Sequence, residues 1–361
     1  MPASVTVRGV GLRLSEVDDM PALARRLTAA PPPATARRFA APDTVLAPLE
    51  RPVYGPVEPR VPARAGARGL RTVPHESLLA LASAADTPAR PEARKPDDTT
   101  AVVWASSTAG LPEYATVCAE ASTLEPGFVA PALGPASAYN GPAATVSIRL
   151  GLAGPNLTLT GGATAGISAI AEAMRLIATG DAAAALVGAS ATVSRWSLTA
   201  APEHLVPAEG AACLALDPAG GPGIRLRECH RTDLVRATAR VIQAAARPET
   251  RPDGLVISTP DTGLVDALAS GQPFPVWHVE RALGDLGAAG GFLAVVGAAA
   301  LCAAVTSHAG NVEERSDEGG RRRPLGAHSE RSEHDRKSPT TILALAVEPC
   351  GSTASLEVST S

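Results

Sequence analysis

The sequence predicts an α/β fold, and three observations support this prediction. Short, uncharged apolar runs recur along the chain, as expected of strands that are buried on both faces. Helical segments separate these runs with short connections, which is typical of βαβ units with parallel pairing. Hydrophobic residues make up 45% of the 361 residues but aromatic residues only 3%, so small side chains must build the core. Small side chains let helices and sheets approach closely, which suits a layered protein.

The first hundred residues have the weakest periodic signals. Val5–Leu14 is predicted to be a strand and Ser77–Ala85 a short helix. The stretch 31–68 between them is rich in Pro, Ala and Arg, a composition that disfavours packed structure, so we expect a loop or a covering arm there. The apolar run Thr100–Ser106 (TAVVWAS) then predicts a strand that is covered on both faces.

From about residue 140 the pattern becomes regular. A run of small and apolar residues predicts a helix over Thr164–Ala178, ended by Gly180. The apolar runs Ala182–Gly188 and Gly210–Asp217 predict the next two strands. This succession indicates a βαβ unit.

The second half repeats this succession. Gly254–Thr259 is predicted to be a strand, Thr262–Ala269 a helix and Pro275–Val279 another strand. The most apolar stretch, Gly287–Val305, consists mostly of Ala and Gly, and it favours a buried helix over a membrane span.

The last fifty residues contain a charged stretch and a pair of strands. Between residues 308 and 338 charges of both signs alternate, which predicts a solvated loop. Thr341–Val347 and Ala354–Val358 then predict a closing hairpin. The length allows two domains or one large unit. We divide the chain into an N-terminal half, 1–217, and a C-terminal half, 218–361.

Charge and cysteine content exclude several classes of protein. The formal net charge of −4 gives no reason to expect a nucleic acid or an anionic membrane as partner. The five cysteines form no CxxC pair, which argues against a disulfide framework and a zinc site. The N-terminus lacks the pattern of a signal peptide, so we expect a cytoplasmic protein. Cys118 and Cys302 are predicted to be buried structural cysteines rather than nucleophiles.

The run GPNLTLTGGATAGISAI, from Gly154 to Ile170, resembles the segment of β-ketoacyl synthases that carries the nucleophilic cysteine. In that family Gly-Pro opens a strand, and a buried helix begins at the cysteine. When the segments are matched from Gly154 and Pro155 onward, the position of the cysteine falls on Ala163.

Four further segments resemble family motifs in the family's order, so the resemblance covers roughly residues 100 to 361. They resemble the strand after the nucleophile helix, the Gly-Glu-Gly-Ala strand, the region with the lysine and the Gly-His turn, and the closing strand. The segments are DAAAALVGAS, EGAACLALD, VWHVERALGDLGAAGG and CGSTASLEV. The resemblance implies the thiolase fold, in which two similar βα halves form five layers of helix, sheet, helix, sheet and helix.

In the same matching, different residues occupy the positions of the family's other catalytic residues. The position of the first histidine, at the end of a strand, falls on Thr259, or on Ser258 if the register slips by one. The second histidine falls on Asp285, and the lysine before it on Glu280. Neither Thr nor Ser can perform imidazole chemistry near neutral pH.

These replacements remove the chemistry of condensation. A ketosynthase needs a thiolate to accept the acyl group, two imidazoles to assist decarboxylation, and N–H groups that form an oxyanion hole. Ala163 has no sulfur, so no thioester can form there, and a carboxylate at Asp285 would oppose a developing enolate. Loss of the nucleophile alone lowers turnover on the order of 10⁶-fold in well-studied enzymes. We therefore expect no condensation in this subunit and no cofactor or metal.

A ketosynthase-like chain without this chemistry is most simply interpreted as a chain length factor of type II polyketide or polyene synthesis. The resemblance implies an active ketosynthase as heterodimer partner, a role in shaping the acyl tunnel, and an acyl carrier protein that carries the growing chain. Such factors in aromatic pathways often have Gln where this chain has Ala163, so the chain departs from their pattern at this position.

The resemblance also implies a dimer-interface strand. In the family, the strand before the nucleophile pairs with its counterpart across a two-fold axis. Here that strand is formed by Asn156, Leu157, Thr158, Leu159 and Thr160. Its alternation of Leu and Thr suits an edge strand that gains a partner.

Other interpretations stay open. The chain could be a homodimeric scaffold, an acyl-carrier-binding module, or an enzyme that reuses the pocket, such as a malonyl decarboxylase. Gly161–Gly166 (GGATAG) lacks the features of a phosphate-binding loop. His278 and Glu280 share a face of a presumed strand, where a surface or core role is favoured. Glu172 and Arg175 are spaced for an ion pair or a contact with a partner.

Overall fold

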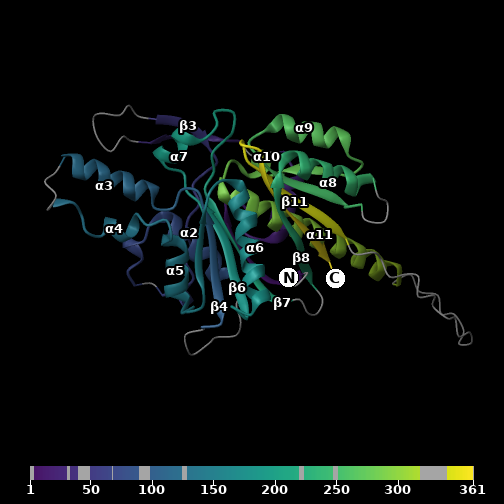
Figure 1. Ribbon diagram of the computed structural model, residues 1–361, viewed down its shortest axis with the longest axis horizontal. Helices are drawn as coiled ribbons and strands as arrows, with labels where there is room; N and C mark the ends of the chain where they lie inside the picture. Colours follow the sequence, from purple (N-terminus) through teal and green to yellow (C-terminus); the bar gives the residue numbers. More distant parts are fainter. Residues whose placement is uncertain are drawn as a thin grey trace, which may run out of the picture.

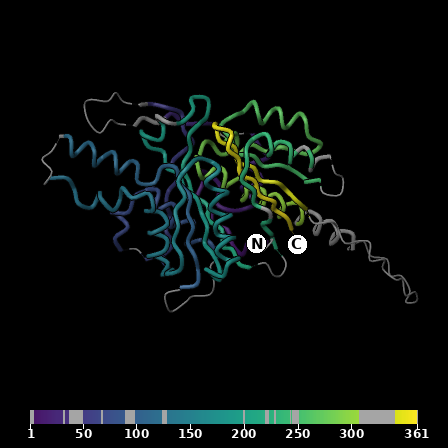
Figure 2. Tube along the Cα trace, viewed as in Figure 1, coloured from purple at the N-terminus to yellow at the C-terminus, as the bar shows by residue number. Residues whose placement is uncertain are grey.

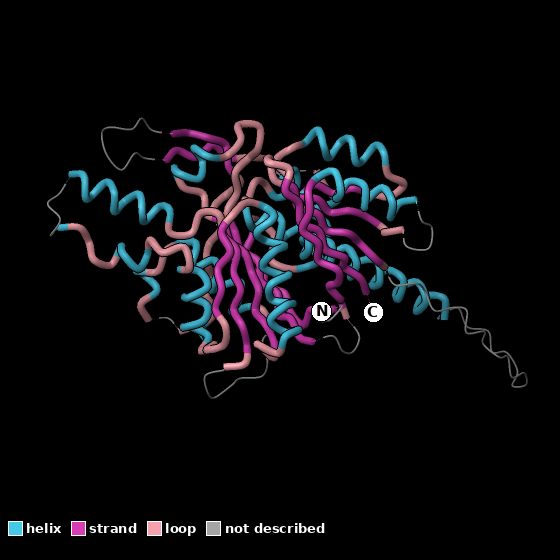
Figure 3. Tube along the Cα trace, in the orientation of Figure 1, coloured by secondary structure: helices cyan, strands magenta, loops and turns pink. Residues whose placement is uncertain are grey.

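The computed structural model shows a layered α/β protein (Figures 1–3). It describes residues 4–30, 33–39, 49–66, 68–88, 98–123, 128–218, 223–246, 251–317 and 340–360. Ten strands of this part of the chain form a single sheet in the order β10-β9-β11-β12-β8-β1-β7-β6-β4-β5.

The N-terminal half contributes five neighbouring strands. β4 is parallel to β5 and β6, whereas β7 is antiparallel to both β6 and β1. These strands are β1 (Ser4–Leu14), β4 (Thr100–Ser106), β5 (Asn156–Thr160), β6 (Ala184–Ala191) and β7 (Gly210–Pro218).

The C-terminal half repeats this topology. β9 is parallel to β10 and β11, and β12 is antiparallel to both β11 and β8. The strands are β8 (Ile224–Asp233), β9 (Gly254–Ser258), β10 (Val276–His278), β11 (Thr341–Val347) and β12 (Ser352–Thr360). Numbered along the chain, the five strands of each half lie in the order 3-2-4-5-1, so the two halves are alike.

Strand β1 joins the two halves. Its first residues pair with β8, nearly its whole length pairs with β7, and its register shifts between Val7 and Gly9. The predicted division after Asp217 lies one residue before the end of β7, and it stays a prediction. One hydrophobic cluster includes buried residues of both halves, such as Ala169 and Val295.

Two long helices form the central layer. α6 (Ala163–Thr179) and α11 (Ala288–Asp317) pack on each other and contact strands of both halves. On the outer faces, α2 (His75–Asp86) and α5 (Gly141–Leu150) cover the N-terminal strands, while α8 (Leu234–Ala246) contacts β8 and β12, and α9 (Thr262–Gly271) contacts β10 (Figure 1). The two halves of the continuous sheet therefore act as two sheet layers, with α6 and α11 between them and other helices on the outside. The five layers expected from the resemblance are present.

Glycines allow α6 and α11 to approach closely. A Cβ atom on Gly291 would overlap the carbonyl group of Ala163, and one on Gly166 would overlap the backbone of Ala288 and Phe292. Because backbone atoms cannot rotate away, larger residues would force the two helices apart. The small-residue composition of the core is therefore a requirement of this crossing.

The described residues contain one helix that is long and apolar enough to cross a membrane, Ala288–Thr306, and 83% of that window is buried inside the protein. It is the core helix predicted over Gly287–Val305. The prediction of a loop from residue 308 is wrong at its start, because α11 continues to Asp317. Glu313, Glu314 and Arg315 in this continuation have high helix propensity. Residues 318–338 of the predicted loop lie outside the described residues.

The prediction for residues 31–68 is correct only in part. Two segments pair as an antiparallel hairpin, β2 (Thr35–Phe39) and β3 (Leu49–Val53), and a short 3-10 helix follows at Ala63–Ala65. Arg51 anchors the hairpin, because its guanidinium donates to the carbonyl oxygens of Leu198, Ala201, Pro202 and Leu205. This long-range anchor holds β3 against the segment 198–205. Residues 31, 32, 40–48 and 67 of the predicted stretch lie outside the described residues.

The remaining helices lie near the ends of the strands or at the periphery. α3, α4 and α5 lie at the end of the molecule opposite α8 and α9 (Figure 1). The further elements are α1 (Met20–Thr28), a second 3-10 helix (Leu70–Thr72), α3 (Leu111–Thr123), α4 (Leu133–Ala136), α7 (Arg195–Ala200) and α10 (Val279–Leu283). The predicted strands and the hairpin of β11 and β12 are confirmed within a few residues.

Candidate functional site

Ala163 lies at the first position of α6, as the sequence predicted for the matched position. β5 ends at Thr160, and a two-residue connection leads into the helix. Ala163 is buried, with 7% of its surface exposed. The N-cap residue, Gly162, has no side chain to accept a hydrogen bond from the first turn.

A carboxylate from another part of the chain takes over this capping role. Glu348 follows β11, and its Oε1 accepts hydrogen bonds from the backbone N–H of Thr164 at 2.8 Å and from the Thr164 hydroxyl at 3.0 Å. An anion at a helix N-terminus is favourable, because the unpaired N–H groups and the helix dipole both attract it. Nothing in the sequence pattern linked Glu348 to Ala163.

The positions matched to the first histidine and the lysine lie together in a buried polar network. Glu280 accepts hydrogen bonds from the Ser258 hydroxyl at 2.5 Å and from the Thr259 backbone N–H at 3.1 Å. His278 Nε2 lies 2.9 Å from Glu280 Oε2 and 2.8 Å from the Thr259 carbonyl oxygen. Since both neighbours of Nε2 are acceptors, Nε2 carries the proton.

This network is closed to solvent. The side chains of His278 and Glu280 are 2% and 4% exposed, and Ser258 and Thr259 are buried. His278 Nδ1 is buried without a hydrogen-bond partner among the described residues. His278 therefore has a core role, one of the two roles that the sequence favoured, and its ring touches two of the matched positions. The prediction that Glu280 shares a strand with His278 is wrong, because β10 ends at His278 and Glu280 lies on a short helix, Val279–Leu283.

The start of α11 brings these groups to the same region. Gly291 lies against the carbonyl of Ala163, and Gly290 lies against Ser258 and Glu280. The Ser107 hydroxyl donates to the Gly161 carbonyl at 2.5 Å and accepts from the Ala288 N–H at 2.8 Å. It therefore connects the turn before α6 with the start of α11.

Asp285 occupies the turn before α11. Its Oδ1 accepts a hydrogen bond from the Gly287 N–H at 3.0 Å. Its backbone pairs with the segment before β7, donating to Val206 O at 2.8 Å and accepting from Ala208 N at 2.9 Å. The carboxylate thus stabilises a turn, and the structure places it beside the helix start where the sequence expected it.

Residues 73–219 match the family model described as the N-terminal domain of β-ketoacyl synthases. The match includes Ala163 and β5, and it covers less than half of the chain. No curated protein matches the sequence.

Solved structures extend the ketosynthase likeness to the whole chain. "The ishigamide ketosynthase/chain length factor" shares 20% identity with a TM-score of 0.67, and the match covers 99% of each chain. A β-ketoacyl synthase from Burkholderia phymatum STM815 shares 15% identity with a TM-score of 0.67, covering 99% of this chain and 100% of that one. At these identities the comparison establishes the thiolase-like ketosynthase fold.

A third ketosynthase structure contains a carrier protein. It is the AntDE:AntF structure, titled as a type II PKS acyl-carrier protein in complex with its ketosynthase bound to the hexaketide. It shares 13% identity with a TM-score of 0.65, and the match covers 99% of each chain.

The N-terminal half contains a second polar cluster, which lies at the ends of β4 and β6. The carboxyl group of Glu76 is fully buried and accepts hydrogen bonds from the hydroxyls of Ser106, Thr108 and Ser190 at 2.5, 2.9 and 2.9 Å. Burial raises the pKa of Glu76, and these three bonds oppose the rise only in part. No sequence pattern indicated this cluster, because its hydroxyls come from β4, the turn after β4, and β6.

Glu209 lies nearby and has the opposite shift. Burial alone would raise the pKa of Glu209, but bonds from His75, the Val57 N–H and the Val193 N–H outweigh it and hold the pKa below its ordinary value. A cavity of about 260 Å³ lies between the two carboxyl groups and is also lined by Glu113 and Thr192.

Among the described residues no group of three or more His, Cys, Asp or Glu side chains is arranged to hold a metal ion. The carboxyl groups around the cavity beside Glu76 are therefore not arranged as a metal site.

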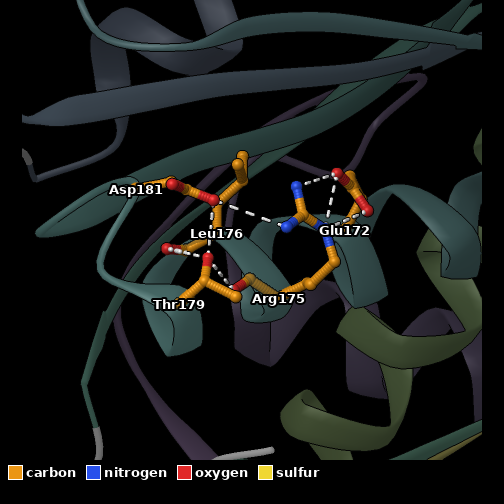
Figure 4. A network of polar contacts seen from close by, with 5 residues as sticks. All are labelled: Glu172, Arg175, Leu176, Thr179 and Asp181. Atoms are coloured by element: carbon orange, nitrogen blue, oxygen red, sulfur yellow. Dashed lines mark hydrogen bonds and ion pairs between the residues drawn. The ribbon is translucent and has the colours of Figure 1, made fainter.

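The predicted pair on the nucleophile-type helix is present. Arg175 contacts Glu172 at 2.8 Å and Asp181 at 3.4 Å, and Thr179 bonds Asp181 at 2.6 Å (Figure 4). These side chains lie at the far end of α6 from Ala163. The interaction is therefore an ordinary ion pair, which leaves the contact with a partner untested.

The cysteines differ in environment. Cys302 is buried as predicted, and burial raises its pKa to about 12. The prediction for Cys118 is wrong: it is exposed, because α3 lies at the periphery rather than between layers. Cys350 is also exposed, on the turn that carries Glu348, and a bond with Ser352 lowers its pKa.

The edge position predicted for the dimer-interface strand is correct. β5 ends the sheet, with β4 as its neighbour, and Leu157 and Leu159 pack partly against the core. Since Val102 N donates to Pro155 O, the peptide groups of residues 157 and 159 face β4, and those of 156, 158 and 160 face the open edge. Whether a partner strand pairs there stays a prediction.

Proposed function

We propose that the chain is a non-catalytic ketosynthase-like subunit, a chain length factor that pairs with an active ketosynthase and shapes its acyl tunnel. The observation that carries this proposal is Ala163 at the buried start of α6. In a fold that otherwise retains the ketosynthase arrangement, the position that needs a nucleophile has only a methyl group.

The other groups at this site support loss of catalysis. Condensation needs acid–base groups and positive or dipolar stabilisation of an enolate. Asp285 and Glu280 are instead acceptor groups, already bonded to the protein's own N–H and O–H donors. The imidazole of His278 is bonded through Nε2 and lines neither larger cavity of the described residues.

The surface near β5 supports pairing with another subunit. Large side chains are exposed on the part of the chain that precedes β5. Ile148 of α5, a helix that contacts β5, is 78% exposed, and Tyr114 of α3 and Tyr139 of the turn before α5 are each 56% exposed. An open strand edge near an exposed aliphatic side chain is typical of interfaces. The fold likeness to a ketosynthase/chain length factor supports the same partner class.

The proposal extends to an acyl carrier protein and a cytoplasmic location. The solved complex of a ketosynthase with its carrier protein supports the first, since a shared fold offers comparable surfaces.

Co-expression tests the proposed function. The chain, carrying an affinity tag, is expressed alone and with an untagged ketosynthase that retains Cys and both His. We expect a stable one-to-one complex in co-expression and poor solubility or weak self-association alone. A well-folded homodimer that ignores the ketosynthase would favour the scaffold interpretation and contradict the heterodimer.

A further inference from the structure

The carboxylate of Glu348 fills the space in front of α6. It bonds the backbone N–H and the hydroxyl of Thr164, as described above. A Cβ atom on Gly162 would lie within contact distance of both carboxylate oxygens. The absence of a side chain on Gly162 is therefore what lets the carboxylate reach the helix.

The turn that carries Glu348 is held firmly. Its backbone N–H donates to Ser352 O at 2.9 Å, and its carbonyl accepts from Gly351 N at 2.9 Å. Gly351 has a φ of 83°, which few other residues adopt. The chain between β11 and β12 thus presents the carboxylate to α6 from a fixed position.

The first N–H groups of a helix that begins at a nucleophile stabilise negative charge at the reacting centre. Here an internal anion already uses the Thr164 N–H and would repel a second anion. We propose that Glu348 is a built-in plug of the inactive site, which excludes acyl thioesters and carboxylates independently of the missing thiol. This inference extends the proposed function and rests on it, because the start of α6 is taken there to be an inactive ketosynthase site.

The consequence is that restoring the cysteine alone leaves the site closed. A thiol at residue 163 would lie beside a fixed carboxylate, which disfavours the thiolate. Removal of the carboxylate would free the N–H donor and remove the repulsion. A change of about one pKa unit corresponds to about a tenfold change in thiolate fraction near neutral pH.

The test measures alkylation of a thiol introduced at residue 163. The exposed cysteines are first removed (C118S and C350S), and A163C is then studied with Glu348 retained or with E348Q or E348A. In the reaction the thiolate sulfur forms a bond to the CH₂ group of iodoacetamide as iodide leaves. Peptide mass mapping gives the rate for the introduced thiol alone. E172Q, on the same helix but paired with Arg175, is the matched control.

We expect A163C to react slowly with Glu348 in place and at least about ten times faster with E348Q and E348A. E172Q should leave the rate unchanged. Equal rates for A163C with and without E348Q, or no reaction in any of the three backgrounds, would overturn the proposal, because the carboxylate would then not be what closes the site.

A second variant covers failure of A163C to fold. T164C replaces the hydroxyl that bonds Glu348 with a thiol, and its rate should show the same dependence on residue 348. Neither measurement needs a ketosynthase. Failure of the heterodimer in co-expression would therefore leave the plug testable, and failure of the plug would leave the heterodimer untouched.

Discussion

The two halves of the sheet have the same strand order, but they end in different edges. The N-terminal half ends in β5, which has five residues and contacts α5, the helix that carries the exposed Ile148. The C-terminal half ends in β10, which has three residues and runs directly into α10. A short edge that leads into a helix resists pairing, whereas a longer edge with free peptide groups invites it. A repeated topology therefore leaves one edge suited to a partner.

The ends of the strands differ in the same sense. At the ends of β4 and β6, the carboxyl groups of Glu76 and Glu209 line a cavity of about 260 Å³. At the ends of β9 and β10, a closed, buried network of hydrogen bonds is formed by Ser258, Thr259, His278 and Glu280. The polar network of the C-terminal half is thus closed, whereas the two carboxyl groups of the N-terminal half line a cavity.

The largest expected effect comes from blocking the edge of β5. In T158P the backbone N–H that faces the open edge is lost, while the ladder to β4 stays intact. We expect at least a tenfold loss of co-purified ketosynthase. T158A, which keeps the N–H, should bind normally, and so should V276P at the other edge. The comparison fails if V276P impairs the complex as much as T158P.

Removal of the Glu280 carboxylate from the closed network should lower the unfolding free energy strongly without abolishing folding. E280A leaves Ser258, the Thr259 N–H and His278 without their shared partner, so we expect a loss of about 3 kcal/mol in unfolding free energy. R281A, at the neighbouring exposed position, should cost at most about 0.5 kcal/mol. Urea unfolding of both variants near neutral pH provides the measurement. Equal losses would show that the network is not a source of stability.

The two carboxyl groups beside the cavity should respond to pH in opposite directions. The pKa of Glu76 is raised, so its contribution to stability is complete below the ordinary value of 4.5 and is lost as the pH rises through the folded-state pKa. The unfolding free energy of E76Q should therefore increase relative to that of the wild type as the pH rises. The pKa of Glu209 is lowered, so its contribution is present above 4.5 and is lost as the pH falls through the folded-state pKa.

E209Q should accordingly lose about 2 kcal/mol near neutral pH and less in acid. Unfolding free energies from urea titrations at several pH values test both variants. Parallel pH profiles for E76Q and E209Q would refute the assignment of opposite shifts.

The smallest effect is expected at the far end of α6. Glu172 and Arg175 form an exposed pair, so E172Q should not shift the thermal midpoint measurably. It should also leave assembly unchanged, because no described feature connects it with β5. A lower yield of complex with E172Q would instead indicate that this end of α6 contacts the partner.

Local patterns predicted the parts of the molecule that local patterns determine. The apolar runs identified β4, β6, β7 and β9, because strands buried on both faces need no polar residues. The position of Ala163 at a helix start followed from the family motif and the small residues after it. The edge position of β5 followed from its alternation and from the resemblance.

Contacts between distant segments could not be predicted in this way. Glu348 reaches Thr164 across 184 residues, and the bonds of Glu76 join α2 to two strands. Arg51 anchors β3 through carbonyls that lie 147 and 150 residues further along the chain. Cys118 was expected to be buried because its sequence surroundings looked apolar or helical, but a peripheral helix leaves such residues exposed.

The most direct test of the central idea is the intact mass of both chains after the co-purified complex has been incubated with an acyl thioester. The account predicts an acyl adduct on the ketosynthase chain and an unchanged mass for this chain. An acyl adduct on this chain, removed by hydroxylamine and mapped to a residue near the start of α6, would contradict it.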